Sequence, residues 1–309
     1  MSTVGLVGSG AMGSALGAGW IEGGHEVLTC LADRSDRTRR LVEQAGLHTV
    51  AALDDVLVQS DVVLSVVPPG SATTVAELIA DATRRTGASP LVADLNAVAP
   101  QTVEQVRQTL AAAGCGLVDG SISGGPPRAD GDPVRVYLSG EQAAELVAIT
   151  NPRIDALTLP GPVGAASALK MCTASMYKGT RALVMQALLT AEQHGVREQF
   201  LADCSRVWPA DVPGWPGDVA VAATKAWRYV AEMEQIALTQ AGAGLPAELF
   251  EGVAAAYARA AQTPLGRTAP EDVDRRADLR AVLAGLQADD PAQGAEPAGG
   301  RTLRAPAER

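Results

Sequence analysis

The stretch TVGLVGSGAMG, residues 3–13, decides the fold of the first half of the chain. Its apolar start predicts a buried strand, and Gly8, Gly10 and Gly13 follow in the spacing G-x-G-x-x-G. In such a turn the first glycine permits the tight bend, the second lets backbone approach a pyrophosphate, and the third lets helix and strand pack closely. A merely flexible turn is the alternative, but the strand before it and the helical pattern after it favour dinucleotide binding. The predicted cofactor contacts in this turn are Gly8, Ser9, Gly10, Ala11, Met12 and Gly13.

Beyond this turn, short apolar runs alternate with amphipathic helical patterns. The runs EVLTCL, DVVLSVVP and PLVADLN predict further buried strands. This alternation indicates a parallel sheet with helices on both faces, so the predicted fold class is α/β. After VRVYLSG the strand signals stop, and from about Val163 the pattern is helical. We expect a dinucleotide-binding domain over residues 1–162, an all-helical domain over 163–287 and a disordered, Pro/Gly/Ala-rich tail over 288–309.

The composition argues against several other classes of protein. The chain has 309 residues, 47% of them hydrophobic, and its net charge of -10 argues against a nucleic-acid partner. No run of about 18 apolar residues is present, so we expect no membrane span and no membrane partner. The four cysteines lie far apart without a Cys/His cluster, which indicates free thiols in a reducing cytoplasm and no metal site.

The segment CLADRSDRTRR after the second predicted strand bears on the choice between NAD and NADP. An acidic residue at the strand end accepts from the ribose 2′-hydroxyl, whereas arginine suits a 2′-phosphate. Leu31 stands where the strand should end, and Arg34, Ser35 and Arg37 follow it. These three residues favour NADP as the cofactor. NAD stays possible, because Asp33 can still reach the ribose if the arginines belong to a solvated helix start.

The loop DGSISGG, residues 119–125, is a candidate substrate site. Gly124 and Gly125 after Ser123 expose backbone N–H groups, which is one way to hold a carboxylate. An ordinary glycine-rich turn has the same composition, so the loop alone does not decide between the two.

A lysine within the helical stretch GAASALKMCTASMYKG, residues 164–179, is the second candidate. A charge among small and apolar residues is costly unless it is needed, although a lysine can also pack its stem and keep its amine in water. Helical periodicity places Lys170, Thr173 and Tyr177 on one stripe. Lys178 lies roughly 80° round the helix from Lys170, which predicts a solvated position. The helix extends from about Val163 to a C-cap at Gly195.

Taken together, GLVGSGAMG, SVVPPG, ADLNAVAP, DGSISGG and GAASALK occur in the order typical of one family. Over roughly residues 4–265 the sequence resembles the β-hydroxyacid dehydrogenases, relatives of 6-phosphogluconate dehydrogenase. The resemblance implies a Rossmann domain, a long linking helix, an all-helical C-terminal domain and a homodimer formed through that domain. It implies cofactor contacts at Val67, Pro68 and Asn96, and a small-molecule substrate. The residues it assigns to the substrate are Ser123, Gly124, Gly125, Thr173 and Asn96, while Tyr177 either lines the pocket or packs in the core.

The sequence departs from the family in its catalytic helix, which reads G-x-G-x-x-x-K-x-x-N-N in other members. Thr173 and Ala174 replace the two asparagines, and Asn96 stands where a serine is usual. Thr173 keeps one hydrogen bond to the substrate at shorter reach, and Asn96 can restore an amide. We therefore expect a substrate other than the simplest hydroxyacids.

The resemblance implies hydride transfer between the nicotinamide and a β-hydroxyacid or related carbonyl compound, with Lys170 as the catalytic general acid/base. Partial burial and the nearby cationic nicotinamide should lower the pKa of Lys170. Two alternatives stay open. One is an imine reductase, in which an aspartate or tyrosine is more usual at this position; the other is a cofactor-binding protein without turnover. Arg228 can clamp a substrate carboxylate or simply pair with Glu232 one helical turn away.

Overall fold

The structure is a computed structural model that describes residues 1–287. The tail predicted to be disordered, residues 288–309, lies outside the described residues. The chain forms two compact units, which are described separately. The first comprises residues 1–183 and 228–257, and the second comprises residues 184–227 and the described residues from 258 onward.

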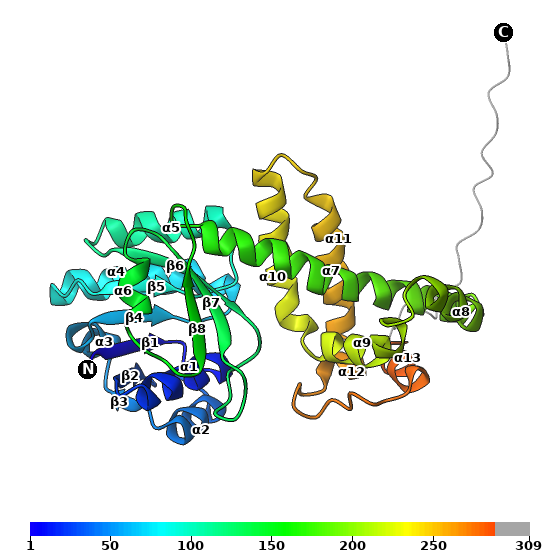
Figure 1. Cartoon of the computed structure of the whole chain (residues 1–309), viewed down its shortest axis with the longest axis horizontal. Helices are drawn as coiled ribbons and strands as arrows, with labels where there is room; N and C mark the ends of the chain where they lie inside the picture. The colour runs from blue at the N-terminus through cyan, green and yellow to red at the C-terminus, as the bar shows by residue number, and fades with distance from the viewer. Residues whose placement is uncertain (288–309) are drawn as a thin grey trace, which may run out of the picture. The chain divides into compact units, whose positions relative to one another are not determined.

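An eight-stranded sheet in the order β3-β2-β1-β4-β5-β6-β7-β8 forms the centre of the first unit (Figure 1). The strands are β1 (Thr3–Val7), β2 (Glu26–Cys30), β3 (His48–Val50), β4 (Val62–Ser65), β5 (Leu91–Asp94), β6 (Leu117–Ser123), β7 (Val134–Ser139) and β8 (Ile154–Thr158). Strands β1 to β6 are parallel, and the strand order changes direction between β1 and β4. Ligands of such sheets bind at this switch point, outside the carboxyl ends of the strands.

The last two strands depart from the parallel arrangement predicted for the sheet. β7 is antiparallel to β6, and β8 is parallel to β7. The reason is the connection: residues 124–133 contain no helix, and a parallel return normally needs a crossover of that kind. β3 and β8 were not predicted, because most of their residues are exposed or half-buried and give no apolar run.

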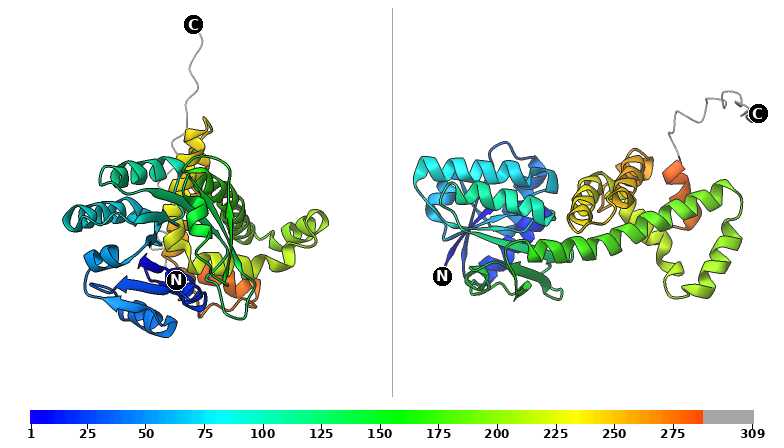
Figure 2. Two further views of the ribbon diagram at one scale, coloured as in Figure 1. Left: turned by 60° about the vertical axis from the view of Figure 1, so that its left-hand side comes forward. Right: turned by 90° about the horizontal axis from the view of Figure 1, so that it is seen from above.

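Helices cover both faces of the sheet, as predicted (Figure 2). One hydrophobic core joins the sheet to α1 (Ala11–Glu22), α2 (Asp36–Ala45) and α6 (Ala143–Val147). A second core joins the opposite face to α3 (Leu53–Gln59), α4 (Ala72–Thr86) and α5 (Pro100–Ala111). The short turn η1 (Pro69–Ser71) precedes α4. The predicted α/β class is therefore confirmed.

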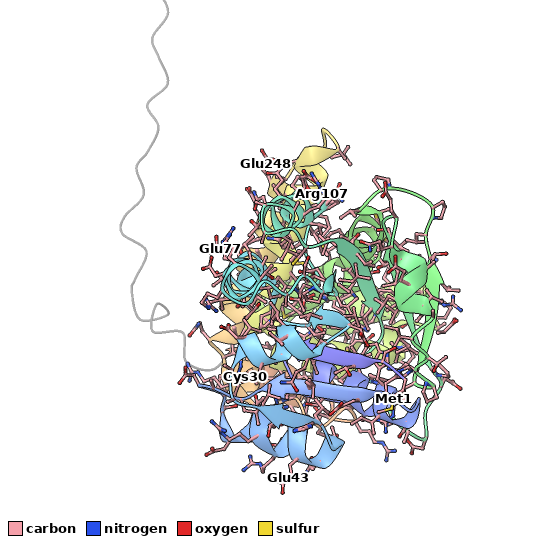
Figure 3. All side chains as sticks on the ribbon, turned by 90° about the vertical axis from the view of Figure 1, so that its left-hand side faces the viewer. Met1, Cys30, Glu43, Glu77, Arg107 and Glu248 are labelled. Carbon is pink, nitrogen blue, oxygen red and sulfur yellow. The ribbon has the colours of Figure 1, made fainter. Side chains whose placement is uncertain are left out.

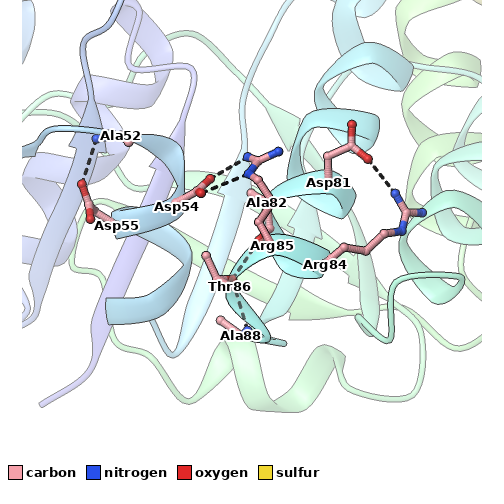
Figure 4. Close-up of polar contacts among 9 residues, drawn as sticks. All are labelled: Ala52, Asp54, Asp55, Asp81, Ala82, Arg84, Arg85, Thr86 and Ala88. Atoms are coloured by element: carbon pink, nitrogen blue, oxygen red, sulfur yellow. Dashed lines mark hydrogen bonds and ion pairs between the residues drawn. The ribbon is translucent and has the colours of Figure 1, made fainter.

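Charged side chains occupy the outer faces of these helices. Figure 3 shows Glu43, Glu77 and Arg107 at the outside of the unit, on α2, α4 and α5. In Figure 4 the Arg85 guanidinium of α4 donates to both carboxylate oxygens of Asp54 in α3, at 2.6 and 3.1 Å. Both side chains are at least one-third exposed, so this ion pair orients the two helices more than it stabilises them.

The long helix α7 spans Ala165–Gln193, close to its predicted extent, and its residues up to Leu183 belong to the first unit. Gly195 ends it with a φ of 67°. Its N–H donates to the Glu192 carbonyl, and the next N–H, of Val196, donates to the Ala191 carbonyl. This pair of bonds is a Schellman cap, which confirms the predicted role of Gly195.

Two further helices pack on α7 and α5 within the first unit. Helix α11 (Glu248–Ala261) approaches α7 closely, because a Cβ added at Gly179 would lie 3.3 Å from the Phe250 ring. Helix α10 (Ala226–Gly242) presents Gln235, whose side-chain oxygen accepts from the Ala99 N–H at 2.8 Å and the Thr102 hydroxyl at 2.7 Å. Gln235 therefore caps the N-terminus of α5.

The second unit is helical. It contains the end of α7 together with α8 (Arg197–Val207), η2 (Val212–Gly214), α9 (Trp215–Thr224), α12 (Pro264–Arg267) and α13 (Leu279–Gln287). Within residues 1–287, no helix combines the length and the apolar character needed to span a bilayer.

Candidate active site

The glycine turn between β1 and α1 has the geometry that its spacing predicts. Gly8 has a φ of 98°, and a Cβ there would collide with the backbone carbonyl of Val66. A Cβ at Gly13 would collide with the Gly8 carbonyl, so helix and turn are in close contact. A Cβ at Gly10 would meet nothing within 4 Å. Gly10 therefore leaves open space at the N-terminus of α1, the place at which turns of this kind bind a pyrophosphate.

The other residues of this turn act through their backbone. Ser9 is 2% exposed, and its hydroxyl lies 3.1 Å from that of Thr29 on β2. Its carbonyl accepts from the Ser14 hydroxyl at 2.7 Å. The Ser9 side chain is thus directed into the protein. Ala11 and Met12 form the first turn of α1, where N–H groups have no partner within the helix.

The segment after β2 presents exposed polar groups. Asp33 adopts a left-handed conformation with a φ of 56°, which turns the chain before Arg34 and α2. Arg34 and Arg37 are exposed. Ser35 is the N-cap of α2, and its hydroxyl accepts from the Thr38 N–H at 3.3 Å. The hydroxyl of Ser35 can still donate to a ligand, because capping uses it as an acceptor.

Asn96 lies just beyond β5 and is almost fully hydrogen-bonded within the protein. Its side-chain oxygen accepts from the Val67 N–H at 2.6 Å. Its amide nitrogen donates to Ser65 Oγ and to Asp94 Oδ2, both at 2.9 Å. Because Asn96 is 3% exposed and both amide hydrogens are donated, its direct contact with a ligand stays a prediction. Pro68, next to Val67, is exposed.

Asp94 completes this network from the end of β5. Its Oδ1 accepts from the Asn96 N–H at 2.9 Å. Burial raises the pKa of the Asp94 carboxyl to about 7; hydrogen bonds from Asn96 oppose the increase, and the charge of Asp119 adds to it. Nothing in the sequence pattern singled Asp94 out, because it reads as the last residue of a buried strand.

Asp119 on β6 anchors the beginning of α7. Its carboxylate is fully buried and accepts from the N–H groups of Gly164 and Ser167, at 2.9 and 3.0 Å, and from the Ser167 hydroxyl at 2.6 Å. The Ser139 hydroxyl of β7 donates to the same carboxylate at 3.0 Å and accepts from the Ala166 N–H. A carboxylate at a helix N-terminus is favoured by the free N–H groups and by the helix dipole. The start of α7 is therefore fixed to β6 and β7.

This anchor places Lys170 one turn further along α7, beside the candidate substrate loop. The Lys170 amine donates to the Ile122 carbonyl at 2.6 Å, and Ile122 directly precedes Ser123. Burial lowers the pKa of Lys170, and the positive charge of Arg228 lowers it further. Lys170 is thus a half-buried amine with a depressed pKa, as the sequence predicted.

The other predicted substrate residues have distinct environments. Ser123, Gly124 and Gly125 are exposed at the end of β6, and Gly124 has a φ of 145°. The Thr173 hydroxyl donates to the Lys170 carbonyl at 3.1 Å. Tyr177 is 66% exposed, so it is no core residue of the first unit. Lys170 and the loop are brought together, whereas no described contact joins Tyr177 to them.

Lys178 corrects the prediction of a solvated position. Its side chain is 13% exposed, forms an ion pair with Glu232 of α10, and lies 4.7 Å from the centre of the Tyr229 ring. Helical periodicity could not predict this, because α10 covers that face of α7. Arg228 also pairs with Glu232, at 3.3 Å. The second of its two predicted roles, the pair within α10, is therefore observed.

The predicted residues gather at one edge of the sheet. Adjacent parallel strands end at the same edge, and β1, β4, β5 and β6 are followed by Gly8, Val67, Asn96 and the Ser123 loop respectively. Sequence reasoning did not identify Asp94, Ser139 and Ser167 as site residues. It matched Asp119 to a motif without recognising that Asp119 anchors α7. The bonds that join Asp119 to Ser139 and Ser167 span 20 and 48 positions, so no local pattern reveals them.

Comparison with known proteins identifies the class. Residues 3–151 match the NAD binding domain of 6-phosphogluconate dehydrogenase, and residues 191–260 match a domain of unknown function, DUF1932. The chain is 26% identical over 297 residues to 3-hydroxyisobutyrate dehydrogenase of Pseudomonas aeruginosa, covering 93% of this chain and 96% of that protein.

Two solved structures share the fold. Mycobacterium tuberculosis 3-hydroxyisobutyrate dehydrogenase, with L-serine, has a TM-score of 0.66 at 20% identity, covering 93% of this chain and 100% of the other. An imine reductase from Myxococcus stipitatus, in complex with NAD+, has a TM-score of 0.52 at 15% identity, with 93% and 99% covered.

The sheet, the glycine turn and the matched NAD binding domain identify an NAD(P)-dependent oxidoreductase. The match of residues 3–151 to the NAD binding domain of 6-phosphogluconate dehydrogenase confirms the resemblance found in the sequence.

Proposed function

We propose that this protein is an NADP-dependent dehydrogenase or reductase of a β-hydroxyacid or its carbonyl counterpart, with Lys170 as general acid/base. The observation that carries the proposal is the Lys170 amine, half-buried, with a lowered pKa, and bonded to the Ile122 carbonyl beside the exposed loop of Ser123, Gly124 and Gly125. The name of the Pseudomonas aeruginosa relative supports a hydroxyacid as the substrate.

The nicotinamide, when bound, supplies or accepts the hydride. The turn of Gly8, Gly10 and Gly13 would hold the pyrophosphate, because Gly10 leaves its backbone accessible. In alcohol oxidation the neutral Lys170 amine takes the hydroxyl proton while the adjacent carbon loses hydride. In carbonyl reduction the ammonium form donates that proton to the developing alkoxide and stabilises its charge.

Substrate binding is assigned to the loop and to the helix. Ser123 and the N–H groups of Gly124 and Gly125 would receive the carboxylate. The Thr173 hydroxyl can accept from the substrate while it donates to the Lys170 carbonyl, but it can donate to the substrate only if it gives up that bond. With Thr173 and Ala174 in place of the two asparagines, the pocket favours a substrate that needs fewer amide contacts than the simplest hydroxyacids do.

The preference for NADP rests on Arg34, Ser35 and Arg37 at the end of β2. Arg34 and Arg37 are exposed, so their guanidinium groups can meet a 2′-phosphate, with the Ser35 hydroxyl as a further donor.

The described cysteines are unpaired, which supports a reducing cytoplasm as the location of the protein.

The decisive test compares the wild-type protein with Lys170→Met. NADPH oxidation is measured against a panel of β-oxoacids, simple aldehydes and cyclic imines, and NADPH binding is measured separately by fluorescence. We expect turnover of an oxoacid that falls by about 10²–10⁴-fold in Lys170→Met, with cofactor binding retained. The rate of carbonyl reduction should fall as the pH rises through the lowered pKa of Lys170, because the proton donor is lost.

Three outcomes would contradict the proposal. Reduction of cyclic imines alone would favour an imine reductase. Cofactor binding without turnover of any compound would favour a non-catalytic protein. Unchanged turnover in Lys170→Met would remove the lysine from the chemistry.

A further inference from the structure

Two buried carboxyl groups lie on neighbouring strands at the edge of the sheet that carries the site. Asp94 on β5 and Asp119 on β6 are paired in register and are 2% and 0% exposed. Asp119 receives four hydrogen bonds, two of them from N–H groups at the start of α7. Asp94 receives two, and both come from Asn96. The proposed chemistry of Lys170 uses the Asp119 carboxylate as the anchor of α7. It gives the Asp94 carboxylate no role.

The hydrogen bonds of Asp94 lead to the backbone beside the phosphate turn. The backbone N–H and the side-chain amide of Asn96 both donate to Asp94. These bonds direct the side-chain oxygen of Asn96 to the Val67 N–H, from which it accepts at 2.6 Å. Val66, the residue before Val67, lies against the glycine turn, because its carbonyl fills the space that a Cβ of Gly8 would need. Its N–H also donates to the Val7 carbonyl, which extends the pairing of β1 with β4. Asp94, Asn96 and Val67 therefore form one continuous chain of contacts to the switch point of the sheet.

We propose that Asp94 is a positioning residue for the cofactor: it fixes Asn96, and Asn96 fixes the Val67 backbone against which the nicotinamide end of the dinucleotide binds. The inference rests on the NAD(P) site assigned above. Asp94 does not touch the cofactor in this scheme. It acts by holding a loop in the shape that the cofactor requires, so its removal raises the dissociation constant of the cofactor.

The charge of Asp94 controls how firmly it holds Asn96. As a carboxylate, it accepts from both the N–H and the amide group of Asn96. A proton on the oxygen that accepts from the amide would oppose that donor and release the side chain. Ser65 faces this network from β4 and does not titrate, while Asp119 is the charged group that faces Asp94 from β6. Asp119 itself accepts hydrogen bonds from four donors.

The Asp94 pKa of about 7 sets the pH range of the effect. Below that pH Asp94 is protonated and its hold on Asn96 is weakened; above it the carboxylate forms and the hold is complete. Cofactor binding should consequently tighten as the pH rises through about 7.

The test measures NADPH dissociation constants by fluorescence from roughly pH 5.5 to roughly pH 8.5 for the wild-type protein, Asp94→Asn and Asn96→Ser. The wild-type dissociation constant should increase by about tenfold toward the acidic end. In Asp94→Asn one carboxylate oxygen becomes an NH2 group facing the donors of Asn96, so we expect a constant about tenfold higher at pH 8 and independent of pH. Asn96→Ser leaves Asp94 intact but is too short to reach Val67, and it should give the same result.

Thr83→Val is the matched control for loss of a buried hydrogen bond. Thr83 is 3% exposed on α4, and its hydroxyl lies 3.3 Å from the Cys115 sulfur, ahead of β6 at the opposite edge of the sheet. This variant should lower the melting temperature without changing the affinity for NADPH or its pH dependence. If Asp94→Asn and Asn96→Ser behave like Thr83→Val, the positioning role is wrong while the dehydrogenase assignment stands. If the wild-type protein binds neither NADPH nor NADH, the proposed function itself fails.

Discussion

Among single residues, Arg34 is one of the three to which the preference for NADP is assigned. We expect Arg34→Ala to raise the KM for NADPH by about tenfold, because a charged hydrogen bond contributes about 1.5–3 kcal/mol. The KM for NADH should change by less than about twofold, since NADH lacks the 2′-phosphate that Arg34 would contact. Steady-state kinetics with both cofactors checks this.

Arg40→Ala is the control, because Arg40 is also an exposed arginine and lies within α2. It should leave both KM values unchanged. Equal losses with NADPH and NADH in Arg34→Ala would instead assign Arg34 a general electrostatic role and reopen the choice of NAD.

Close backbone contacts at the glycine turn were predicted from the sequence. A Cβ at Gly8 or Gly13 would collide with backbone, whereas the approach of a cofactor to Gly10 stays a prediction. Lys178 was predicted wrongly, because its environment depends on α10, about fifty residues later in the chain. Asn96 stays a predicted cofactor contact, and its hydrogen bonds connect the ends of strands β4 and β5. Side-chain roles set by distant partners leave no local trace in the sequence.

At the scale of elements, we expect the attachment of α7 to β6 to be highly sensitive to a single substitution. Asp119→Asn keeps the size of the side chain but turns one acceptor oxygen into a donor that faces the N–H and hydroxyl groups. We expect the free energy of unfolding to fall by about 2–3 kcal/mol, as for loss of charged hydrogen bonds. Turnover should fall further than stability explains, because Lys170 follows this anchor by one helical turn.

Denaturant unfolding and kinetics on the same samples check this prediction. Asp155→Asn is the matched control: Asp155 on β8 forms an exposed ion pair with Arg135, so its loss should cost less than about 1 kcal/mol. A native-like stability of Asp119→Asn would show that α7 is held mainly by packing.

The strands show where element prediction from sequence reaches its limit. The apolar runs of β1, β2, β4 and β5 are buried on both faces of the sheet and are legible as such. β3 and β8 lie at the two edges of the sheet, where few residues are buried. The direction of β7 depends on a connection without a helix, which composition does not reveal.

At the scale of the whole molecule, the domain boundary at residues 162 and 163 stays a prediction. The first compact unit includes the start of α7 and most of α10 and α11 together with the sheet. Gln235 shows why α10 groups with the sheet. It forms hydrogen bonds to the N-terminus of α5, although the sequence places its helix in the other domain. A division by sequence pattern follows secondary-structure type, whereas compactness follows such contacts.

The expected homodimer makes a prediction about exposed apolar side chains on α7. Met176 and Leu183 are seven residues apart, share one helix face and are 69% and 62% exposed in the chain by itself. Two such groups on one stripe are more favourable when a second copy covers them. We therefore expect the wild-type protein to elute with twice the 31.6 kDa mass of one chain, and the double variant Met176→Glu, Leu183→Glu to elute as a monomer.

Light scattering coupled to size exclusion measures this directly, over a range of protein concentrations. Leu78→Glu is the control, because Leu78 is a 52% exposed leucine on α4, which packs on the sheet. This substitution should not change the measured mass. Since burying a glutamate without a partner disfavours association, the double variant should dissociate while keeping its helical content and NADPH binding. A wild-type monomer, or a double variant that stays dimeric, would place the subunit contact elsewhere or remove it.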